Sequence, residues 1–209
     1  MTESMLLVFI VTSIVLIVTP GQDMILVMSR SITQGWKAGV MTAAGVSVGL
    51  LGHTMIAAVG LGAILRASET LFFAMKMIGS VYLLYLGFKL IQNSREAGLN
   101  ISRQSIIPLR KMFFQGALSN ISNPKIIIFY LAYLPQFIPL NSNKPAVMLF
   151  MLGIAFAVLT FMVKGPIGCA AGLLSNWLRS RPAIIKWINR ASGVVLIGLG
   201  LRLAFEKRS

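Results

Sequence analysis

Long apolar runs separated by shorter polar segments make up most of the sequence. Each run is close to the roughly 20 residues that an α-helix needs to cross the hydrocarbon core of a bilayer. The six runs are Met5–Met28, Ala38–Leu65, Leu71–Ile91, Met112–Ile138, Ala146–Leu174 and Ala183–Phe205. The alternation of a membrane β-strand does not occur in runs such as Ile78–Leu86. The pattern predicts an all-α polytopic membrane protein with six transmembrane helices.

The polar segments divide the chain into two halves. The short segments are Ser29–Lys37, Arg66–Thr70, Pro139–Pro145 and Ser175–Pro182. The longer segment, Gln92–Lys111, carries Arg95, Glu96, Arg103, Arg110 and Lys111. We expect a first three-helix repeat over 1–91, a basic cytoplasmic linker over 92–111 and a second three-helix repeat over 112–209. Because each half has an odd number of spans, the second half is inverted in the membrane, as in many secondary transporters.

Basic residues near the span ends predict the orientation. If the chain crosses the membrane six times, ten basic residues lie on one side of it: Arg30, Lys37, Lys89, Arg95, Arg103, Arg110, Lys111, Arg179, Arg181 and Lys186. On the other side lie Arg66, Lys144, Lys207 and Arg208. Excess Lys and Arg stay in the cytoplasm, so both termini are expected outside a bacterial inner membrane. A five-span chain with opposed termini is the alternative if Met112–Ile138 is re-entrant.

Composition agrees with lipid as the solvent. The 209 residues are 56% hydrophobic and 11% charged, whereas an average soluble domain has about 25% charged residues. The net charge of +14 lies mostly between apolar runs, so it indicates topology rather than nucleic-acid binding. The single cysteine, Cys169, excludes an internal disulfide, and the single histidine, His53, argues against a His-rich metal site. We expect no cofactor and no bound metal.

Each half begins with a span that contains proline. The first break reads Thr19-Pro20-Gly21-Gln22-Asp23, and the second reads Asn120-Ile121-Ser122-Asn123-Pro124-Lys125. A proline has no N–H and crowds the carbonyl four residues earlier, which frees backbone groups that must find other partners. Paired interruptions of this kind point to a substrate site at the bilayer midplane, although a structural kink is the alternative. The predicted substrate-binding residues are Pro20, Gly21, Gln22, Asp23, Asn120, Asn123, Pro124 and Lys125.

Asp23 is an acid inside an apolar span. A carboxylate at this depth costs at least about 2.5 kcal/mol on insertion scales, so Asp23 requires a partner. The candidates are Lys76, Lys125 and Lys164, which also lie inside spans. Asp23 either binds a substrate ammonium or exchanges a proton, and a purely structural Asp–Lys pair is the alternative.

The other ionisable residues within spans have two interpretations each. Lys125 stands at the start of a half-helix, which favours an anion nearby. Lys76 either joins a charge pair or extends to the headgroups. Lys164 lies in a third predicted break, Phe161–Pro166, and is either functional or structural. His53 either relays protons or is a hydrogen-bonded core histidine.

Glycine pairs with small-xxx-small spacing predict close helix packing. They are Gly35/Gly39, Gly45/Gly49 and Gly168/Gly172. The same spacing would serve a homodimer interface, so a homodimer is left open.

The combination of these motifs resembles the LysE/RhtB family of amino-acid exporters over nearly the whole chain. In the first half the similar residues are Thr19-Pro20-Gly21, Asp23-Met24, Arg30-Ser31, Gly35, Ala38-Gly39, Gly45, Gly49, His53, Gly60-Leu61, Lys76 and Tyr82 through Gly87. In the second half they are Phe114-Gln115-Gly116, Asn120, Asn123-Pro124-Lys125 and Phe129 through Phe137. Gln22 replaces the second proline of the Pro-Gly-Pro that family members commonly have. The resemblance implies export of an amino acid such as threonine, homoserine, leucine or lysine, driven by the proton motive force.

The resulting hypothesis is a secondary exporter of a small amino acid that works by alternating access with proton antiport. Asp23 would hold the substrate ammonium, while Lys125 and the amides after Pro20 and Pro124 would hold the carboxylate. An exporter of another small cationic compound or a metal ion is the nearer alternative, but it predicts more acids than bases within the spans. An intramembrane enzyme is the more distant one, and no Ser–His, paired-Asp or HExxH pattern supports it.

Overall fold

The computed structural model describes residues 3–19, 21–61, 69–93, 107–139, 142–174 and 182–205. These residues are helical apart from short connections. The α-helices are α1 (Glu3–Val18), α2 (Gln22–Gln34), α3 (Trp36–Ile56), α5 (Glu69–Asn93), α6 (Leu109–Ile121), α7 (Pro124–Ile128), α8 (Pro145–Leu173) and α10 (Pro182–Phe205). The π-helices η1 (Ala57–Leu61) and η2 (Phe129–Tyr133) extend α3 and α7, and the 3-10 helix η3 (Leu134–Phe137) follows η2. The prediction of an all-α protein is confirmed for the described residues.

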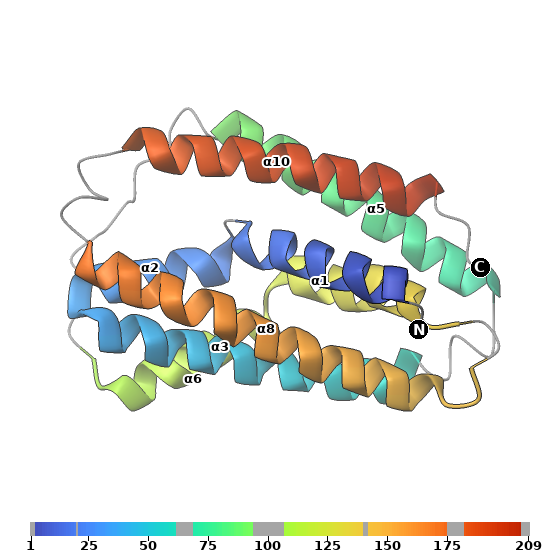
Figure 1. The fold of residues 1–209 in the computed structure, drawn as a ribbon, viewed down its shortest axis with the longest axis horizontal. Coiled ribbons are helices and arrows are strands. Elements are labelled where there is room, and N and C mark those ends of the chain that lie inside the picture. Colours follow the sequence, from blue (N-terminus) through green and yellow to red (C-terminus); the bar gives the residue numbers. More distant parts are fainter. Residues whose placement is uncertain are drawn as a thin grey trace.

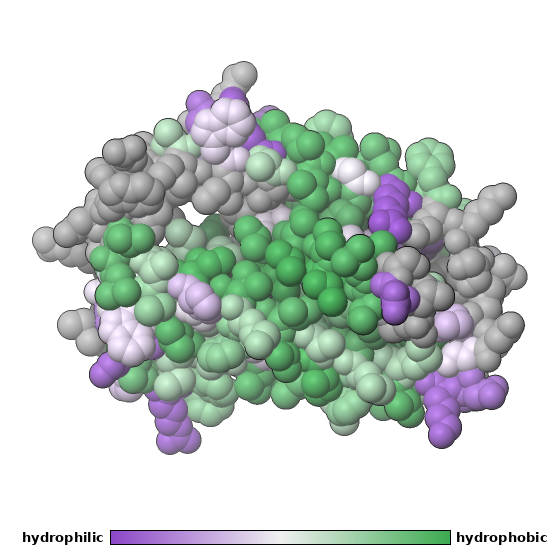
Figure 2. All heavy atoms as spheres, viewed as in Figure 1, coloured by the Kyte–Doolittle hydropathy of each residue, from purple (hydrophilic) through white to green (hydrophobic). Residues whose placement is uncertain are grey.

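Helices occupy each of the six predicted apolar runs. By length and composition, α3 with η1 and α8 are long and apolar enough to cross a membrane, and the bent pair α1 and α2 adds a third if it counts as one span. Large apolar side chains such as Leu7, Val59 and Met151 are exposed on the described helices. Figure 2 shows a broad apolar surface with hydrophilic residues toward its two ends. This surface suits contact with lipid.

Two layers of helices enclose the first broken helix (Figure 1). Helices α5 and α10 pack along each other, and helix α3 packs against both α6 and α8. Between these layers, α1 contacts α8 and α10, while η2 contacts α5. Helix α1 begins and α10 ends at the same end of the molecule, on the right in Figure 1. The breaks in the first and second halves therefore lie inside the bundle.

Glycines allow the backbones of these helices to approach closely. A Cβ on Gly45 would overlap the carbonyl of Phe113 on α6, and a Cβ on Gly168 would press on Gly39 of α3. Gly35 has a different task, because it joins α2 to α3 with a φ of 90°, a conformation that favours glycine. The predicted close packing at the spacings that contain Gly39, Gly45 and Gly168 is confirmed.

Two boundary predictions are wrong. The polar segment Ser29–Lys37 is not a loop, because α2 continues to Gln34 and only Gly35 separates it from α3. Several of its polar side chains face protein rather than water: Ser29, Arg30 and Ser31 are buried, and Ser31 donates a hydrogen bond to the carbonyl of Gly168. The predicted third break is also wrong, since α8 continues through Pro166. One missing N–H does not end a long helix that its neighbours pack against.

Candidate functional site

The first break exposes carbonyl groups at the C-terminal end of α1. The helix ends at Val18, and α2 begins at Gln22 with a bend of 55° between the two. Residue 20 is a proline and lies outside the described residues, but its lack of an N–H deprives the Leu16 carbonyl of its helical donor. The Lys125 ammonium donates to that carbonyl over 3.1 Å and to the Thr19 carbonyl over 3.0 Å. A cation from the second half thus completes the broken helix of the first.

The second break also has a carbonyl that loses its helical donor to a proline, but its partners differ. Helix α6 ends at Ile121, and Asn123 begins α7 by accepting a hydrogen bond from the Lys125 backbone N–H over 3.1 Å. Pro124 cannot donate to the Asn120 carbonyl. Instead, this carbonyl lies 3.1 Å from Nε2 of His53, which must carry the proton because a carbonyl only accepts. His53 is therefore a buried, hydrogen-bonded histidine that supports the break, and its predicted role in proton transfer stays a prediction.

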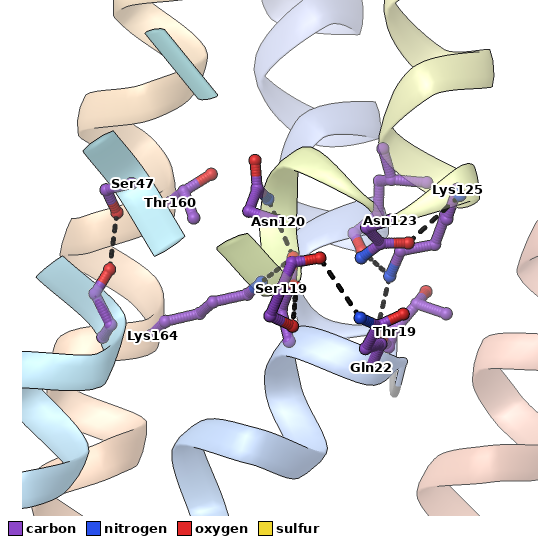
Figure 3. A network of polar contacts seen from close by, with 12 residues as sticks. Thr19, Gln22, Ser47, Ser119, Asn120, Asn123, Lys125, Thr160 and Lys164 are labelled. Carbon is purple, nitrogen blue, oxygen red and sulfur yellow. Dashed lines mark hydrogen bonds and ion pairs between the residues drawn. The ribbon is translucent and has the colours of Figure 1, made fainter. Parts of the chain in front are cut away.

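Asp23 lies where the two breaks meet and is only 1% exposed. Its partners Ser119, Asn120 and Lys164 are labelled in Figure 3. Its Oδ1 accepts a hydrogen bond from Ser119 over 3.0 Å, and its Oδ2 accepts one from the Asn120 side chain over 2.8 Å. Lys164 extends from α8 and places Nζ 3.5 Å from Oδ2. Of the predicted partners of Asp23, the structure brings Lys164 into the ion pair.

The other two lysines occupy different places. Lys125 is buried. It donates a hydrogen bond to the Leu16 carbonyl, although the two residues are 109 positions apart in the sequence. Its ammonium contacts backbone carbonyls rather than the anion that its position in α7 led us to expect. Lys76 is buried on α5, with Nζ 5.6 Å from the centre of the Phe73 ring. The site thus contains one carboxylate and the two ammonium groups of Lys125 and Lys164.

Two further predicted residues line the junction. The Gln22 side chain donates to the Ser119 carbonyl over 3.3 Å. Gly21 is extended, with a φ of −160° that any residue can adopt, so its conformation does not demand glycine. A Cβ at this position would lie 3.2 Å from Nζ of Lys125, so a larger residue requires the ammonium to shift. Gly21 lets the ammonium approach the end of α1.

Two side-chain atoms of the junction remain unsatisfied. Oδ1 of Asn120 and Nδ2 of Asn123 are buried without a hydrogen-bond partner. Asn123 lies close enough to Asp23 to interact with its carboxylate, but without a hydrogen bond of ordinary geometry. A buried polar atom without a partner is costly. One free acceptor and one free donor beside an ion pair match the needs of a small zwitterion.

Sequence reasoning missed Ser119. Its hydroxyl binds Asp23 and its carbonyl binds Gln22, so it connects α6 to α2 twice. A signal was available, because Ser119 is polar, lies in an apolar run and directly precedes Asn120. Serine is common inside membrane helices as a packing residue, which is why the pattern alone did not single it out.

Comparison with known proteins identifies the family of the chain. The family model described as LysE type translocator matches residues 14–207. The chain belongs to the LysE type translocator family. Among curated relatives of this LysE-family chain, a leucine efflux protein of Klebsiella pneumoniae is 27% identical over 198 residues, covering 95% of this chain and 93% of the relative. An uncharacterized membrane protein, YrhP, of Bacillus subtilis is 30% identical over 207 residues, covering 94% and 97%.

A leucine efflux protein of Salmonella typhimurium is 24% identical to the LysE-family chain over 196 residues, covering 94% of the chain and 92% of the relative. No solved structure matches the chain. The family and the apolar helices identify an integral membrane protein of the translocator type. The descriptions of the family and of its efflux relatives are those of transporters, not enzymes.

Proposed function

We propose that this LysE-family protein is a proton-coupled secondary exporter of a small amino acid, and that Asp23 is the centre of its substrate site. The observation that carries the proposal is the buried meeting point of the two helix breaks. There Asp23 lies beside Lys164, and Lys125 closes the end of α1. A site of both signs suits a molecule that carries both an ammonium and a carboxylate.

Each end of such a molecule has candidate partners. The ammonium would contact Asp23 and the free Oδ1 of Asn120, displacing Lys164 from its carboxylate. The carboxylate would contact the free Nδ2 of Asn123 and, when it displaces the carbonyls of α1, the Lys125 ammonium. These exchanges replace one set of charge-assisted hydrogen bonds by another, which keeps the cost of opening the site low. A metal ion or a purely cationic compound would leave the lysines uncompensated.

Proton coupling follows from the same charges. When substrate leaves, Asp23 must regain Lys164 or take up a proton, because an isolated carboxylate in this place is too costly. Alternation between these two states links substrate release to the proton gradient. His53 reaches the junction through the Asn120 carbonyl and is the candidate relay.

We also propose six spans arranged as two inverted repeats, in a multi-pass protein of the bacterial inner membrane. In support, two helices of the first half pack against their counterparts: α3 lies along α8, and α5 along α10. The two breaks, which correspond in this scheme, touch through Asp23 and Lys125. The start of α1 and the end of α10 lie at one end of the molecule. Helices α3 and α6, which begin with Lys37 and with Arg110 and Lys111 in their first turns, start at the other end. The positive-inside rule assigns this second end to the cytoplasm. A homodimer stays a prediction.

The test is transport by the purified full chain in proteoliposomes. Labelled leucine, threonine, homoserine, lysine and arginine are each assayed with and without an imposed proton gradient. We expect saturable flux of at least one amino acid, accelerated by the gradient and lost in Asp23→Asn. No flux of any of the five, or a variant that transports normally at wild-type abundance, would overturn the proposal.

A further inference from the structure

Arg30 is a buried cation outside the junction. It lies near the C-terminal end of α2 and is 8% exposed. Its Nη2 donates to Oε1 of Gln115 on α6 over 2.8 Å. Its Nε and Nη1 are buried and have no hydrogen-bond partner, and within the described part of the chain no carboxylate forms an ion pair with it. A buried guanidinium with only a neutral partner leaves both its charge and its donors uncompensated.

The position of Arg30 relates it to the substrate site. Arg30 follows Asp23 by seven residues, so it lies on the same face of α2 and about 10 Å away along the helix. Gln115 precedes Ser119 by one helical turn on α6. Helices α2 and α6 thus share polar contacts at two levels, those of Gln22 and Asp23 with Ser119 and Asn120 and that of Arg30 with Gln115. The second contact lies toward the end of the molecule where α2 meets α3, which the proposed orientation places in the cytoplasm.

The unsatisfied donors define the chemistry of the missing ligand. A guanidinium presents a planar fork that matches a carboxylate, and a side-chain amide N–H adds a further donor. Asp23 and Arg30 are about 10 Å apart along α2, whereas the α-ammonium and the carboxylate of an amino acid share one carbon, so these two groups are not expected to bind both side chains at once. Arg30 must therefore act at a different moment of transport from Asp23.

We propose that Arg30 and Gln115 form an anion site that receives the carboxylate of an amino acid entering from the cytoplasm, before its ammonium reaches Asp23. This inference rests on the proposed export of amino acids. The guanidinium attracts the carboxylate, and the molecule then moves two helical turns along α2 to the junction. The acidic end of the path at Asp23 and the basic end at Arg30 give a zwitterion one orientation along it.

The test measures KM and kcat of the five labelled amino acids in vesicles of phosphatidylcholine alone, with substrate on the face that carries Arg30. Arg30→Gln is expected to raise KM about tenfold to a hundredfold, the range that charge-assisted hydrogen bonds give, with little change in kcat. Arg30→Lys keeps the positive charge without the planar guanidinium, so its KM should lie between those of the wild type and Arg30→Gln. Lys37→Gln removes an exposed charge at the same end and is the matched control with unchanged KM.

A second variant separates binding from folding. Gln115→Glu places a carboxylate beside the guanidinium, so it should maintain or raise the thermal midpoint of unfolding in detergent while raising KM. In the wild type, the unlabelled amino acid should inhibit uptake of the labelled one far better than the corresponding carboxamide does. In Arg30→Gln, this difference between the two inhibitors should shrink.

The outcomes distinguish the two proposals. If the wild type transports an amino acid but Arg30→Gln and Gln115→Glu keep its KM, Arg30 is structural and this inference fails alone. A KM shift that appears only when phosphatidylglycerol is added would assign the anion to a lipid headgroup and also overturn it. If the wild type transports none of the five, the proposed function fails and takes this inference with it.

Discussion

The break between α1 and α2 and the break between α6 and α7 have the same covalent cause but supply mostly opposite partners to the contacts between them; Gln22 is the exception, because it donates from the first break to the Ser119 carbonyl of the second. The first supplies acceptors, namely the Leu16 and Thr19 carbonyls and the Asp23 carboxylate. The second supplies donors, namely the side chains of Ser119, Asn120 and Lys125. Each break is completed in part by the other half of the chain, although the Asn120 carbonyl also accepts the Asn123 backbone N–H of its own half. Complementary breaks hold the halves together at the place where a transporter must also open.

The largest effect should come from removing the Asp23 carboxylate from the junction. Asp23→Asn keeps an acceptor for Ser119 but leaves Lys164 without its counter-charge, so transport should fall by about 100-fold or more. Breaking a buried pair costs about 3–5 kcal/mol. The thermal midpoint in detergent should therefore fall as well. Initial rates in proteoliposomes and thermal unfolding of the same preparation measure both effects.

A paired substitution shows which of the two effects matters for function. Asp23→Leu combined with Lys164→Met removes both charges and should recover much of the stability, because an apolar pair often replaces a buried ion pair well. Transport should stay lost. A double variant that regains transport would show that the pair is structural and would remove Asp23 from the substrate site.

The next largest effect should come from removing Lys125, a residue of the second break that donates hydrogen bonds to the first. Lys125→Met leaves the carbonyls of Leu16 and Thr19 unpaired, at about 1–3 kcal/mol for each buried group. We expect a lower thermal midpoint and at least tenfold slower transport, with Lys125→Gln intermediate because it keeps a donor. Lys144→Met, at an exposed lysine, is the control. If Lys125→Met is as stable as wild type, the α1 carbonyls have another partner and the comparison of the breaks fails.

A smaller effect distinguishes the two roles of Asn123. Asn123→Ala loses the cap of α7, which costs about 1 kcal/mol. Asn123→Asp keeps the accepting oxygen and thus the cap, but it replaces the free N–H donor by a negative charge beside Asp23. Asn123→Asp should therefore transport more slowly than the wild type, by more than its change in thermal midpoint explains. Equal transport by Asn123→Asp and wild type at the same abundance would contradict a contact between this amide and the substrate carboxylate.

The smallest effect is expected at Gly21. Because its backbone is extended, Gly21→Ala requires only that the Lys125 ammonium shift slightly, and stability should change by no more than about 1 kcal/mol. Gly21→Leu, which fills the place of the ammonium, should behave like Lys125→Met. Thermal midpoints of the two variants check this order. A severe loss in Gly21→Ala would mean that the break needs the freedom of glycine after all.

Particular residues show how far the sequence could predict the site. The breaks, Asp23 and the lysines stand out because charge and proline are rare and costly in apolar runs. The partner of Asp23 did not stand out, since Lys164 is 141 residues away and three lysines fit the pattern equally well. Arg30 was interpreted as a topology signal in the polar segment after the first span, because a helix whose polar face is buried by protein resembles a polar connection in one dimension.

By itself the sequence determined the solvent, the helical class, the family resemblance and the two places where helices break, because each depends on local composition or on proline. Only the tertiary structure decided which groups meet at those breaks. Lys125 binds the end of α1, His53 supports the end of α6 and Lys164 pairs with Asp23. The physical reason is that a freed carbonyl specifies the need for a donor but not its source. Packing of the two halves selects that donor.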